Sequence, residues 1–440
     1  MKSELIPPTE SHNLTVMQSA TKTCKRWCLC ALGLAIVLGP MAVPPLAQGQ
    51  TFTVLYAFTG GTDGSSPNSV IIDAAGNLYG TTEYGGTLTS CNGSGCGVVF
   101  KLDTTGMETV LHRFGRKGDG ELPFSGVIRD AAGNLYGTTV GGGSALFCFD
   151  GCGAVFKLDV TGNETALHSF SGRIGGADPD AGVIRDAAGN LYGTTSEGGD
   201  LTGGSPCSTL SGCGVVFKLD PTGKETVLYS FTGGVDGAGP TSGVVRDTAG
   251  NLYGTTVQGG DLTGHCAGAD TGCGVVFKLD TAGKETVQYS FTGGGDGYYP
   301  FSGVIRDAAG NLYGTASGGA FDSGTVFKLD NTGKLTVLYS FTGGVDGFQP
   351  NGVIRDAAGN LYGTTAQGGD TSCGNSVSGC GLVFKLDPTG QYTVLYSFTH
   401  GADGSFPDSL IMDAAGNLYG TTEHDGDPTC SCGTVFKIAP

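Results

Sequence analysis

Short apolar runs recur along this chain, and each has the composition of a β-strand. Segment 352–398 contains four of them, at 352–356 (GVIRD), 360–365 (NLYGTT), 381–387 (GLVFKLD) and 392–398 (YTVLYSF). All four are rich in β-branched and aromatic residues and are bounded by turn residues. The connections DAAGN and DPTGQ each contain an Asp that can accept backbone hydrogen bonds and a Gly that tolerates positive φ. The segment is therefore predicted to form two tight hairpins, whose strands we label a to d in chain order.

The same unit recurs seven times. The tetrapeptide NLYG begins at seven asparagines, which are Asn77, Asn134, Asn190, Asn251, Asn311, Asn360 and Asn417. Four antiparallel strands in each unit of roughly 50 residues, without helical periodicity, favour a radial β-propeller over a solenoid. We therefore predict an all-β fold, a seven-bladed β-propeller of four-stranded antiparallel blades.

The two ends of the repeat region predict how the ring closes. Residues 51–58 (TFTVLYAF) match a fourth strand without its first three, and residues 433–438 (GTVFKI) match a third strand without its fourth. If the N-terminal strand completes the last blade, no free sheet edge remains there. The predicted single domain spans 48–440, with blade cores at 69–114, 125–170, 181–231, 242–291, 302–341, 351–398, and 409–438 together with 51–58.

The first 47 residues differ from the repeats. Lys25 and Arg26 precede an apolar run at 28–43, and PPLAQGQ follows it. This order is typical of a secretory signal peptide at 1–47, with cleavage after Ala47. A retained membrane anchor is the alternative, although the run is short for a span of about 20 residues. Because no second apolar span follows, we expect a mature chain without an integral membrane segment, located outside the cytoplasm.

Composition and charge restrict the partners. Gly accounts for 82 residues and charged residues for 14%, which fits short strands joined by glycine-rich turns. The formal charge of −17 makes nucleic acid and anionic membranes poor partners, whereas cations, cationic surfaces and neutral glycans remain open. We expect the protein to be a monomer.

The order of the repeat motifs resembles a known family. DGxxP, DAAGNLYGTT, GCGVVFKLD and TVLYSF follow one another across residues 51 to 440. In the order of these motifs the chain is similar to the GloVer (Gloeobacter–Verrucomicrobia) tandem-repeat family of exported bacterial proteins. The resemblance implies a secreted, periplasmic or cell-surface repeat protein, and it brings no assigned activity with it.

One face of the predicted propeller is more variable than the other. The a–b and c–d turns are tight and nearly identical from blade to blade, whereas the b–c and d–a connections, on the opposite face, differ in length and content. Because loops on a rigid scaffold usually carry function, we expect binding on the face of the b–c and d–a loops.

The b–c connections hold paired cysteines. The pairs are Cys91/Cys96, Cys148/Cys152, Cys207/Cys213, Cys266/Cys273, Cys373/Cys380 and Cys430/Cys432. The fifth blade has the shortest connection and lacks both cysteines, as a local disulfide predicts, and export to an oxidising compartment permits the bond. A metal site is the alternative, but no blade offers the doubled pair or the His partner of a zinc site. Cys430 and Cys432 are the weakest pair, because only one residue separates them.

The d–a connections repeat GGxDGxxP and give one acid to each blade. These acids are Asp63, Asp119, Asp178, Asp236, Asp296, Asp346 and Asp403, although the third blade departs from the pattern with GGADPD. A ring of carboxylates near the central channel would bind Ca²⁺ or a cationic ligand. The favoured interpretation is that each Asp caps its own turn, since a repeated residue usually solves a repeated local problem.

Aromatic residues gather in some of the same connections. They are Phe124, Tyr298, Tyr299, Phe301, Phe348 and Phe406. Of these, Tyr298, Tyr299, Phe348 and Phe406 are candidates for stacking on a sugar ring or a peptide. Packing between neighbouring blades is the alternative.

Histidines that break the repeat are the candidates for catalysis. His112 and His168 replace the Tyr found at the same place in other blades, so we expect them to be packing residues. His265, His400 and His424 are unique to their blades. His400 and His424, with Glu423, Asp425 and Asp427 near them, could form a general acid–base pair or bind a metal near blade 7. No catalytic sequence motif accompanies them.

The favoured function is that of an exported non-catalytic repeat protein that binds a glycan, a peptide or a surface protein through the b–c and d–a loop face. A secreted propeller hydrolase or lyase with a site near blade 7 is one alternative. A purely structural cell-surface protein is another. No cofactor is expected, apart from Ca²⁺ if the Asp ring were to form.

Overall fold

A computed structural model describes residues 49–115, 118–143, 148, 151–199, 207, 212–261, 263, 266, 271–370, 373 and 379–440. The predicted signal peptide at 1–47 and His265 lie outside the described residues. Within the described part of the chain, no helix is long and apolar enough to cross a membrane.

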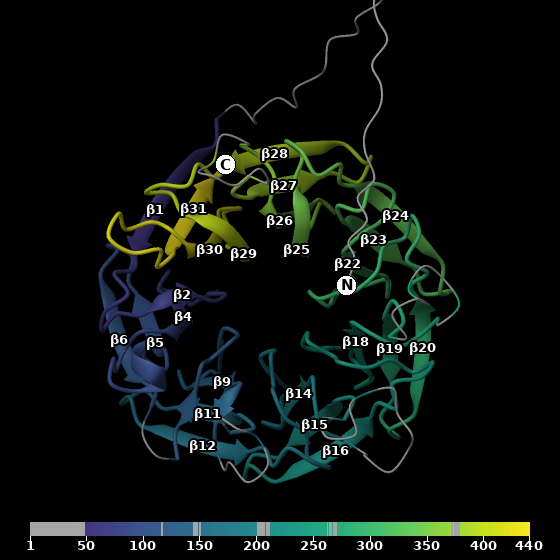
Figure 1. The fold of residues 1–440 in the computed structure, drawn as a ribbon, viewed down its shortest axis with the longest axis horizontal. Helices are drawn as coiled ribbons and strands as arrows, with labels where there is room; N and C mark the ends of the chain where they lie inside the picture. Colours follow the sequence, from purple (N-terminus) through teal and green to yellow (C-terminus); the bar gives the residue numbers. More distant parts are fainter. Residues whose placement is uncertain are drawn as a thin grey trace, which may run out of the picture. The chain divides into compact units, whose positions relative to one another are not determined.

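The described residues form seven antiparallel sheets placed radially around a central axis (Figure 1). From the centre outwards, blade 1 contains β2 (Ser65–Pro67) with β3 (Ile71–Ile72), β4 (Leu78–Tyr84), β5 (Val98–Leu102) and β6 (Glu108–Arg113). Blade 2 contains β8 (Ile128–Arg129), β9 (Leu135–Thr139), β11 (Ala154–Leu158) and β12 (Glu164–Ser169). Blade 3 contains β13 (Ile184–Arg185), β14 (Leu191–Thr195), β15 (Val215–Leu219) and β16 (Glu225–Ser230).

The remaining blades follow the same plan. Blade 4 contains β17 (Val245–Arg246), β18 (Leu252–Thr256), β19 (Val275–Leu279) and β20 (Glu285–Ser290), and blade 5 contains β21 (Val304–Arg306), β22 (Leu312–Ala316), β23 (Thr325–Leu329) and β24 (Leu335–Ser340). Blade 6 contains β25 (Phe348–Arg355), β26 (Leu361–Gln367), β27 (Leu382–Leu386) and β28 (Tyr392–Ser397). The connections add the short pair β7 (Gly120–Glu121) and β10 (Gly141–Gly142), and a 3₁₀ helix, η1 (Cys91–Gly93).

The N-terminal strand closes the ring, as predicted. Blade 7 contains β29 (Ser405–Met412), β30 (Leu418–His424), β31 (Thr434–Ala439) and, as its outermost strand, β1 (Thr51–Ala57). β1 pairs antiparallel with β31, so that Thr51 lies opposite Ala439, and Figure 1 shows the two strands side by side although they are the two ends of the domain. The seven-bladed all-β propeller is therefore confirmed.

The core lies between the blades. A phenylalanine at the end of each outer strand packs edge-on against a phenylalanine in the third strand of the next blade, with ring centroids 5.1 to 5.4 Å apart. The seven pairs are Phe58/Phe100, Phe114/Phe156, Phe170/Phe217, Phe231/Phe277, Phe291/Phe327, Phe341/Phe384 and Phe398/Phe436. These side chains are almost completely buried.

A β-bulge brings neighbouring blades into backbone contact. Every pairing of the two outer strands shifts register once, and in blade 2 the shift leaves Leu167 as the extra residue. The carbonyl oxygen of Leu167 reaches the c–d turn of the next blade at Gly223, where a Cβ would lie 2.2 Å from it. Gly223 also has φ +83°, so both its conformation and its contact require glycine.

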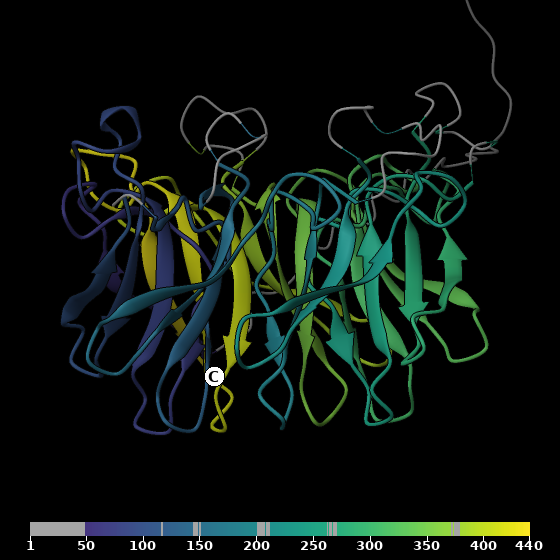
Figure 2. The same ribbon diagram turned by 90° about the horizontal axis from the view of Figure 1, so that it is seen from below.

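The Asp of each a–b turn organises the repeated motif. In blade 2 the Asp130 carboxylate accepts hydrogen bonds from the N–H groups of Ala132 and Asn134, from the Asn134 side chain and from the Tyr136 hydroxyl. The ring of Tyr136 then faces the Arg185 guanidinium of blade 3 at 5.7 Å. The a–b turns line the lower edge of the ring in Figure 2. The motif DAAGNLYG is therefore a structural element that joins blades.

The threonine after this motif makes a second polar bridge between blades. Thr138 Oγ1 donates to the carbonyl oxygen of Ala181 in the next blade at 2.9 Å. Equivalent bonds are made by Thr81, Thr194, Thr255, Thr315 and Thr364. At the last junction Thr421 Oγ1 is buried without a partner among the described residues.

Replacing Asp186 tests the a–b turn. The Asp186→Ala variant leaves four donors without their acceptor, those of Ala188, Asn190 (two) and Tyr192, and should lower the free energy of unfolding by about 1–3 kcal/mol. Denaturant unfolding measures this loss. Val235→Ala, at a side chain that is 76% exposed, is the control and should change little.

The pH dependence of the Asp186 effect checks its cause. Burial by itself would raise the pKa of Asp186, but the hydrogen bonds from Asn190, Tyr192 and Ala188 outweigh burial and lower the pKa. The stabilisation is therefore present above the unfolded pKa of about 3.9 and is lost as the pH falls through the folded pKa. The difference between the wild type and Asp186→Ala should shrink between pH 6 and pH 2, and a constant difference would contradict this account.

Candidate functional site

The aspartates of the d–a connections are held in their own turns. Asp236 accepts hydrogen bonds from the N–H and the hydroxyl of Thr232 and from the hydroxyl of Tyr229, at 2.6 to 3.0 Å. Tyr229 belongs to the outermost strand of its blade, so this carboxylate lies toward the rim and not at the channel. Four further aspartates make the same three bonds, namely Asp63, Asp296, Asp346 and Asp403. This placement favours the interpretation in which each Asp caps its own turn, and it argues against a ring of carboxylates that binds Ca²⁺.

A row of glutamates faces these turns from the next blade. Its members are Glu108, Glu164, Glu225 and Glu285, and each has a buried Oε1 atom without a hydrogen-bond partner among the described residues. Burial, followed by the charge of Asp236, raises the pKa of Glu285 to about 7. Leu335, Tyr392 and Phe52 replace the glutamate in blades 5, 6 and 7. Sequence reasoning missed this row, because its partners lie on another blade.

His112 and His168 occupy the tyrosine position, as predicted from the repeat. Each ring packs edge-on against the phenylalanine two residues later, at 4.8 Å for His112 and 5.0 Å for His168. Both also contact a carboxylate. His112 Nε2 lies 3.1 Å from Asp119, and His168 Nε2 lies 3.4 Å from Glu225.

All six predicted cysteine pairs are disulfides in the structure. The bonds join Cys91 to Cys96, Cys148 to Cys152, Cys207 to Cys213, Cys266 to Cys273, Cys373 to Cys380 and Cys430 to Cys432. Their Cα atoms are 5.2 to 5.8 Å apart. Six disulfides indicate an oxidising environment outside the cytoplasm.

The second cysteine of each pair, at the end of its b–c connection, is buried in the core. Cys152, Cys213 and Cys273 are at most 2% exposed, and each packs in the apolar cluster between its own blade and the next. The reason is their position two residues before the third strand, whose first residues are already buried between the blades. These three cysteines therefore cannot contact a ligand, and each disulfide anchors a b–c connection to the core.

Tyr298 and Tyr299 line one cavity of about 750 Å³ between blades 4 and 5. The rings meet edge-on at 4.9 Å, and the Tyr298 hydroxyl donates to Asp322 Oδ1 at 2.6 Å. This bond, followed by burial, raises the pKa of Tyr298 to about 12. Asp322 was not predicted as a site residue. It stands in the short b–c connection of blade 5, whose position opposite Tyr298 only the fold reveals.

The other two aromatic candidates lie elsewhere. Phe406 and Phe124 line a smaller cavity of about 170 Å³, formed by blades 1, 2, 6 and 7, together with Glu83, Asp408 and Glu423. Burial, followed by the charge of Glu423, raises the pKa of Asp408 to about 6. Phe348 begins β25 opposite Gln367. The four aromatic residues predicted to stack on a ligand therefore do not form a single site.

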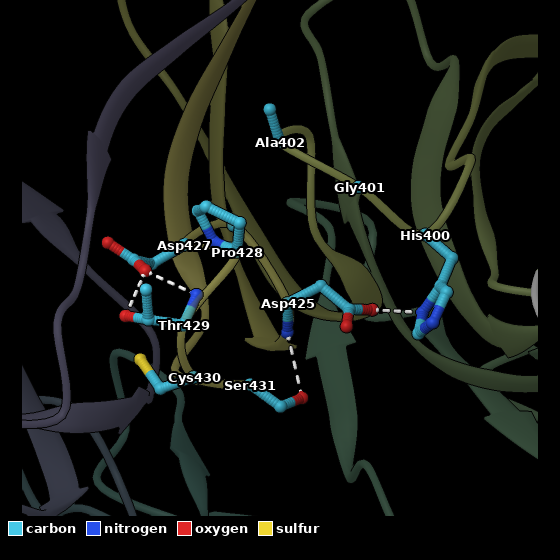
Figure 3. Close-up of a pocket in the computed structure, with 10 residues that line it drawn as sticks. His400, Gly401, Ala402, Asp425, Asp427, Pro428, Thr429, Cys430 and Ser431 are labelled. Atoms are coloured by element: carbon cyan, nitrogen blue, oxygen red, sulfur yellow. Dashed lines mark hydrogen bonds and ion pairs between the residues drawn. The ribbon is translucent and has the colours of Figure 1, made fainter.

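The histidines of blade 7 also separate. His400 Nδ1 lies 2.6 Å from Asp425 Oδ2, and these two residues line a cavity of about 590 Å³ (Figure 3). His424 instead lies 3.6 Å from Glu423 and packs its ring against Phe406. The two histidines of the predicted acid–base pair, His400 and His424, therefore do not line the same cavity.

Asp425, which the sequence places beside His424, is the partner of His400 in this cavity. Its carboxylate also accepts a hydrogen bond from the Ser405 hydroxyl. Because Ser405 donates to Asp425 and His400 contacts the same oxygen, the serine proton faces a carboxylate and not an imidazole. The order of contacts differs from that of a Ser–His–Asp triad, in which His lies between the other two residues.

Comparisons with known proteins give a family and a fold. The sequence pattern of the Gloeobacter/Verrucomicrobia repeat matches residues 45–207 and 152–377. No curated protein matches the chain. Among solved structures, virginiamycin B lyase from Staphylococcus aureus is similar at 10% identity, with 89% of this chain and 99% of that chain covered and a TM-score of 0.52. A gluconolactonase from Xanthomonas campestris is 13% identical, with 89% of each chain covered and a TM-score of 0.40. At 10% identity the lyase shows the fold alone.

The glutamate row predicts a pH-dependent stability. With its raised pKa, Glu285 keeps its proton in the folded protein between about pH 4.3 and pH 7, where the unfolded chain loses it, so stability falls as the pH rises through this window. Glu285→Gln removes this ionisation and should raise the free energy of unfolding at pH 8 by about 1 kcal/mol, after allowance for solvent screening. At pH 4 the variant and the wild type should be nearly equal.

Denaturant unfolding at both pH values measures the effect. Blade 5 offers the reciprocal control, because Leu335 stands where Glu285 stands in blade 4. Leu335→Glu should destabilise the protein more at pH 8 than at pH 4. An effect of Glu285→Gln that is the same at both pH values would show that ionisation is not its cause.

Proposed function

This chain belongs to the Gloeobacter/Verrucomicrobia repeat family, and from that premise we propose that it is an exported, non-catalytic protein that binds a carbohydrate through the b–c and d–a loop face. The oxidising environment that six disulfides require supports the export. The rigid ring below the variable loops supports a binding role, because function on such scaffolds resides in the loops.

The cavity of Tyr298, Tyr299 and Asp322 carries this proposal. A sugar ring presents an apolar C–H face and polar hydroxyl groups, and a tyrosine ring beside a carboxylate complements both. The bond from Tyr298 to Asp322 holds the phenol ring in place before a ligand arrives, which reduces the ordering cost on binding. The short b–c connection of blade 5 leaves this cavity open to a ligand.

Removing the stacking ring should weaken carbohydrate binding. Calorimetry with a panel of neutral polysaccharides identifies a ligand, and Tyr298→Ala should weaken its binding about tenfold, which corresponds to about 1.4 kcal/mol. Tyr298→Phe keeps the ring without the bond to Asp322, so its loss should be smaller. Phe406→Ala, at the smaller cavity of Phe124 and Phe406, is the matched control and should leave the affinity unchanged.

Two outcomes would contradict the carbohydrate site. Binding that survives Tyr298→Ala and is lost in Phe406→Ala would place the ligand at the smaller cavity, beside Glu83, Asp408 and Glu423. A protein that binds no member of the panel and binds a peptide or a surface protein instead would exclude the carbohydrate.

A hydrolase or lyase at blade 7 is the second candidate, and the contact of His400 with Asp425 favours it. The His400 side chain is 50% exposed, and the bond of Nδ1 to Asp425 leaves Nε2 available as a general acid or base toward the cavity. The cavity volume of about 590 Å³ suits a small ligand.

Replacing His400 distinguishes the two candidates. An enzyme that uses this site should lose about 100-fold or more in turnover on His400→Ala, with His424→Ala close to the wild type. A binding protein should show no turnover of the bound carbohydrate, and His400→Ala should keep the wild-type affinity. Product analysis by chromatography and calorimetry on the same preparations measure both.

A further inference from the structure

The junction between blades 1 and 2 combines three potential metal ligands. Three groups of His, Cys, Asp and Glu lie close enough to hold an ion among the described residues, and two of them depend on cysteines that are disulfide-bonded. The third group consists of His112, Asp119 and Glu164, whose ligand atoms all lie within 4.8 Å of one another. We propose that these three residues bind a divalent transition-metal ion, with Zn²⁺ as the representative of the class.

The junction differs from five of the other six in two coordinated ways. At five junctions the Asp carboxylate accepts three hydrogen bonds. One comes from a tyrosine hydroxyl, and the other two come from the N–H and the hydroxyl of a threonine. Here His112 replaces the tyrosine and Gly115 replaces the threonine, while the Asp and the facing Glu are both retained. Among the described residues, the carboxylate of Asp119 keeps only its contacts with His112 Nε2 and with the N–H of Gly120. Described donors therefore occupy fewer of its lone pairs than at the five tyrosine junctions.

Geometry and burial fit a metal. His112 Nε2 and Asp119 Oδ2 are 3.1 Å apart, and two ligands at about 2.0–2.2 Å from one tetrahedral ion stand about 3.3–3.6 Å apart, so a small movement of the side chains would admit the ion. The side chains are 12% and 5% exposed, so water screens them little while an ion can still enter. On the third side, Glu164 Oε1 is buried and has no partner among the described residues.

An ion resolves the electrostatic cost of this arrangement. Two carboxylates that approach each other away from water destabilise their charged forms, and a divalent ion between Asp119 and Glu164 would offset this repulsion. One imidazole and two carboxylates around a divalent ion make a ligand set that is common in protein metal sites. A solvent molecule would complete the coordination.

The neighbouring junctions supply matched controls. Between blades 2 and 3, His168 contacts Glu225, and no d–a Asp makes the equivalent contact with it in the described structure. Between blades 7 and 1, Tyr56 stands in the place of His112, with Asp63 and Glu108 both present. One junction thus has the imidazole with one carboxylate, and the other has both carboxylates without the imidazole.

Titration of the full-length protein with Zn²⁺ tests the proposal. The protein is freed of metal by EDTA and kept oxidised, so that the cysteines remain paired. Calorimetry should show one tight equivalent of Zn²⁺. His112→Tyr should weaken this binding by about 100-fold or more, and Asp119→Asn and Glu164→Gln by at least about tenfold. His168→Tyr should stay within about threefold of the wild type.

The His112→Tyr variant should fold, because a tyrosine with the same two carboxylates already stands at the junctions of Tyr56 and Tyr229. Co²⁺ in place of Zn²⁺ should give visible absorption bands of a site with fewer than six ligands in the wild type, and these bands should be lost in His112→Tyr. The proposal is overturned if the wild type takes up no tight equivalent, or if His112→Tyr and His168→Tyr bind Zn²⁺ equally well.

Discussion

The packing of each blade against the next is the interaction on which the whole structure depends, because a single four-stranded blade cannot bury both of its faces. The edge-to-face phenylalanine pair recurs at all seven junctions and forms the centre of each interblade core. Polar contacts then set the rotation of one blade against the next. The a–b Asp holds the turn and orients the Tyr of strand b, and the following Thr bonds to the backbone of the neighbouring blade. Each copy of the repeated sequence therefore supplies the contacts of one interblade interface.

Blade 7, which β1 and β31 build together, lacks some of the polar bridges of the other junctions. At its junction with blade 1, Thr421 makes no bridge in the described structure, and Ile72 stands where other blades place the arginine that covers the preceding tyrosine. At its junction with blade 6, Met412 takes the place of that arginine, and Phe52 of β1 stacks on the ring of Tyr396 with centroids 3.7 Å apart. An apolar, non-directional contact suits a blade built from both ends of the domain, because it requires less exact alignment than a set of hydrogen bonds.

The sequence predicted the features that depend on residues close together in the chain. Strand order, blade number, the disulfide pairing and the Asp of each a–b turn all follow from local spacing. The site residues that it missed depend on contacts between segments whose approach only the fold determines. Asp322 meets Tyr298 from another connection, and Glu164 faces Asp119 from the next blade. A pattern repeated seven times reports the interface well, but it cannot show which exceptions to the pattern face one another.

The junctions that depart from the repeated sequence differ in which residues are replaced together. This difference helps to identify the departures that serve a function. At the His168 junction the usual Tyr, Thr and Asp are all replaced, by His168, Ser171 and Gly175, and the imidazole contacts the remaining Glu225. At His112 the tyrosine and the threonine are replaced, while Asp119 and the facing Glu164 are kept. A buried carboxylate that loses its donors destabilises the fold unless a positive group lies beside it, which is the role that we assign to the metal ion. The site near blade 5 follows the same logic, since the loss of a cysteine pair accompanies the gain of an open cavity beside Tyr298.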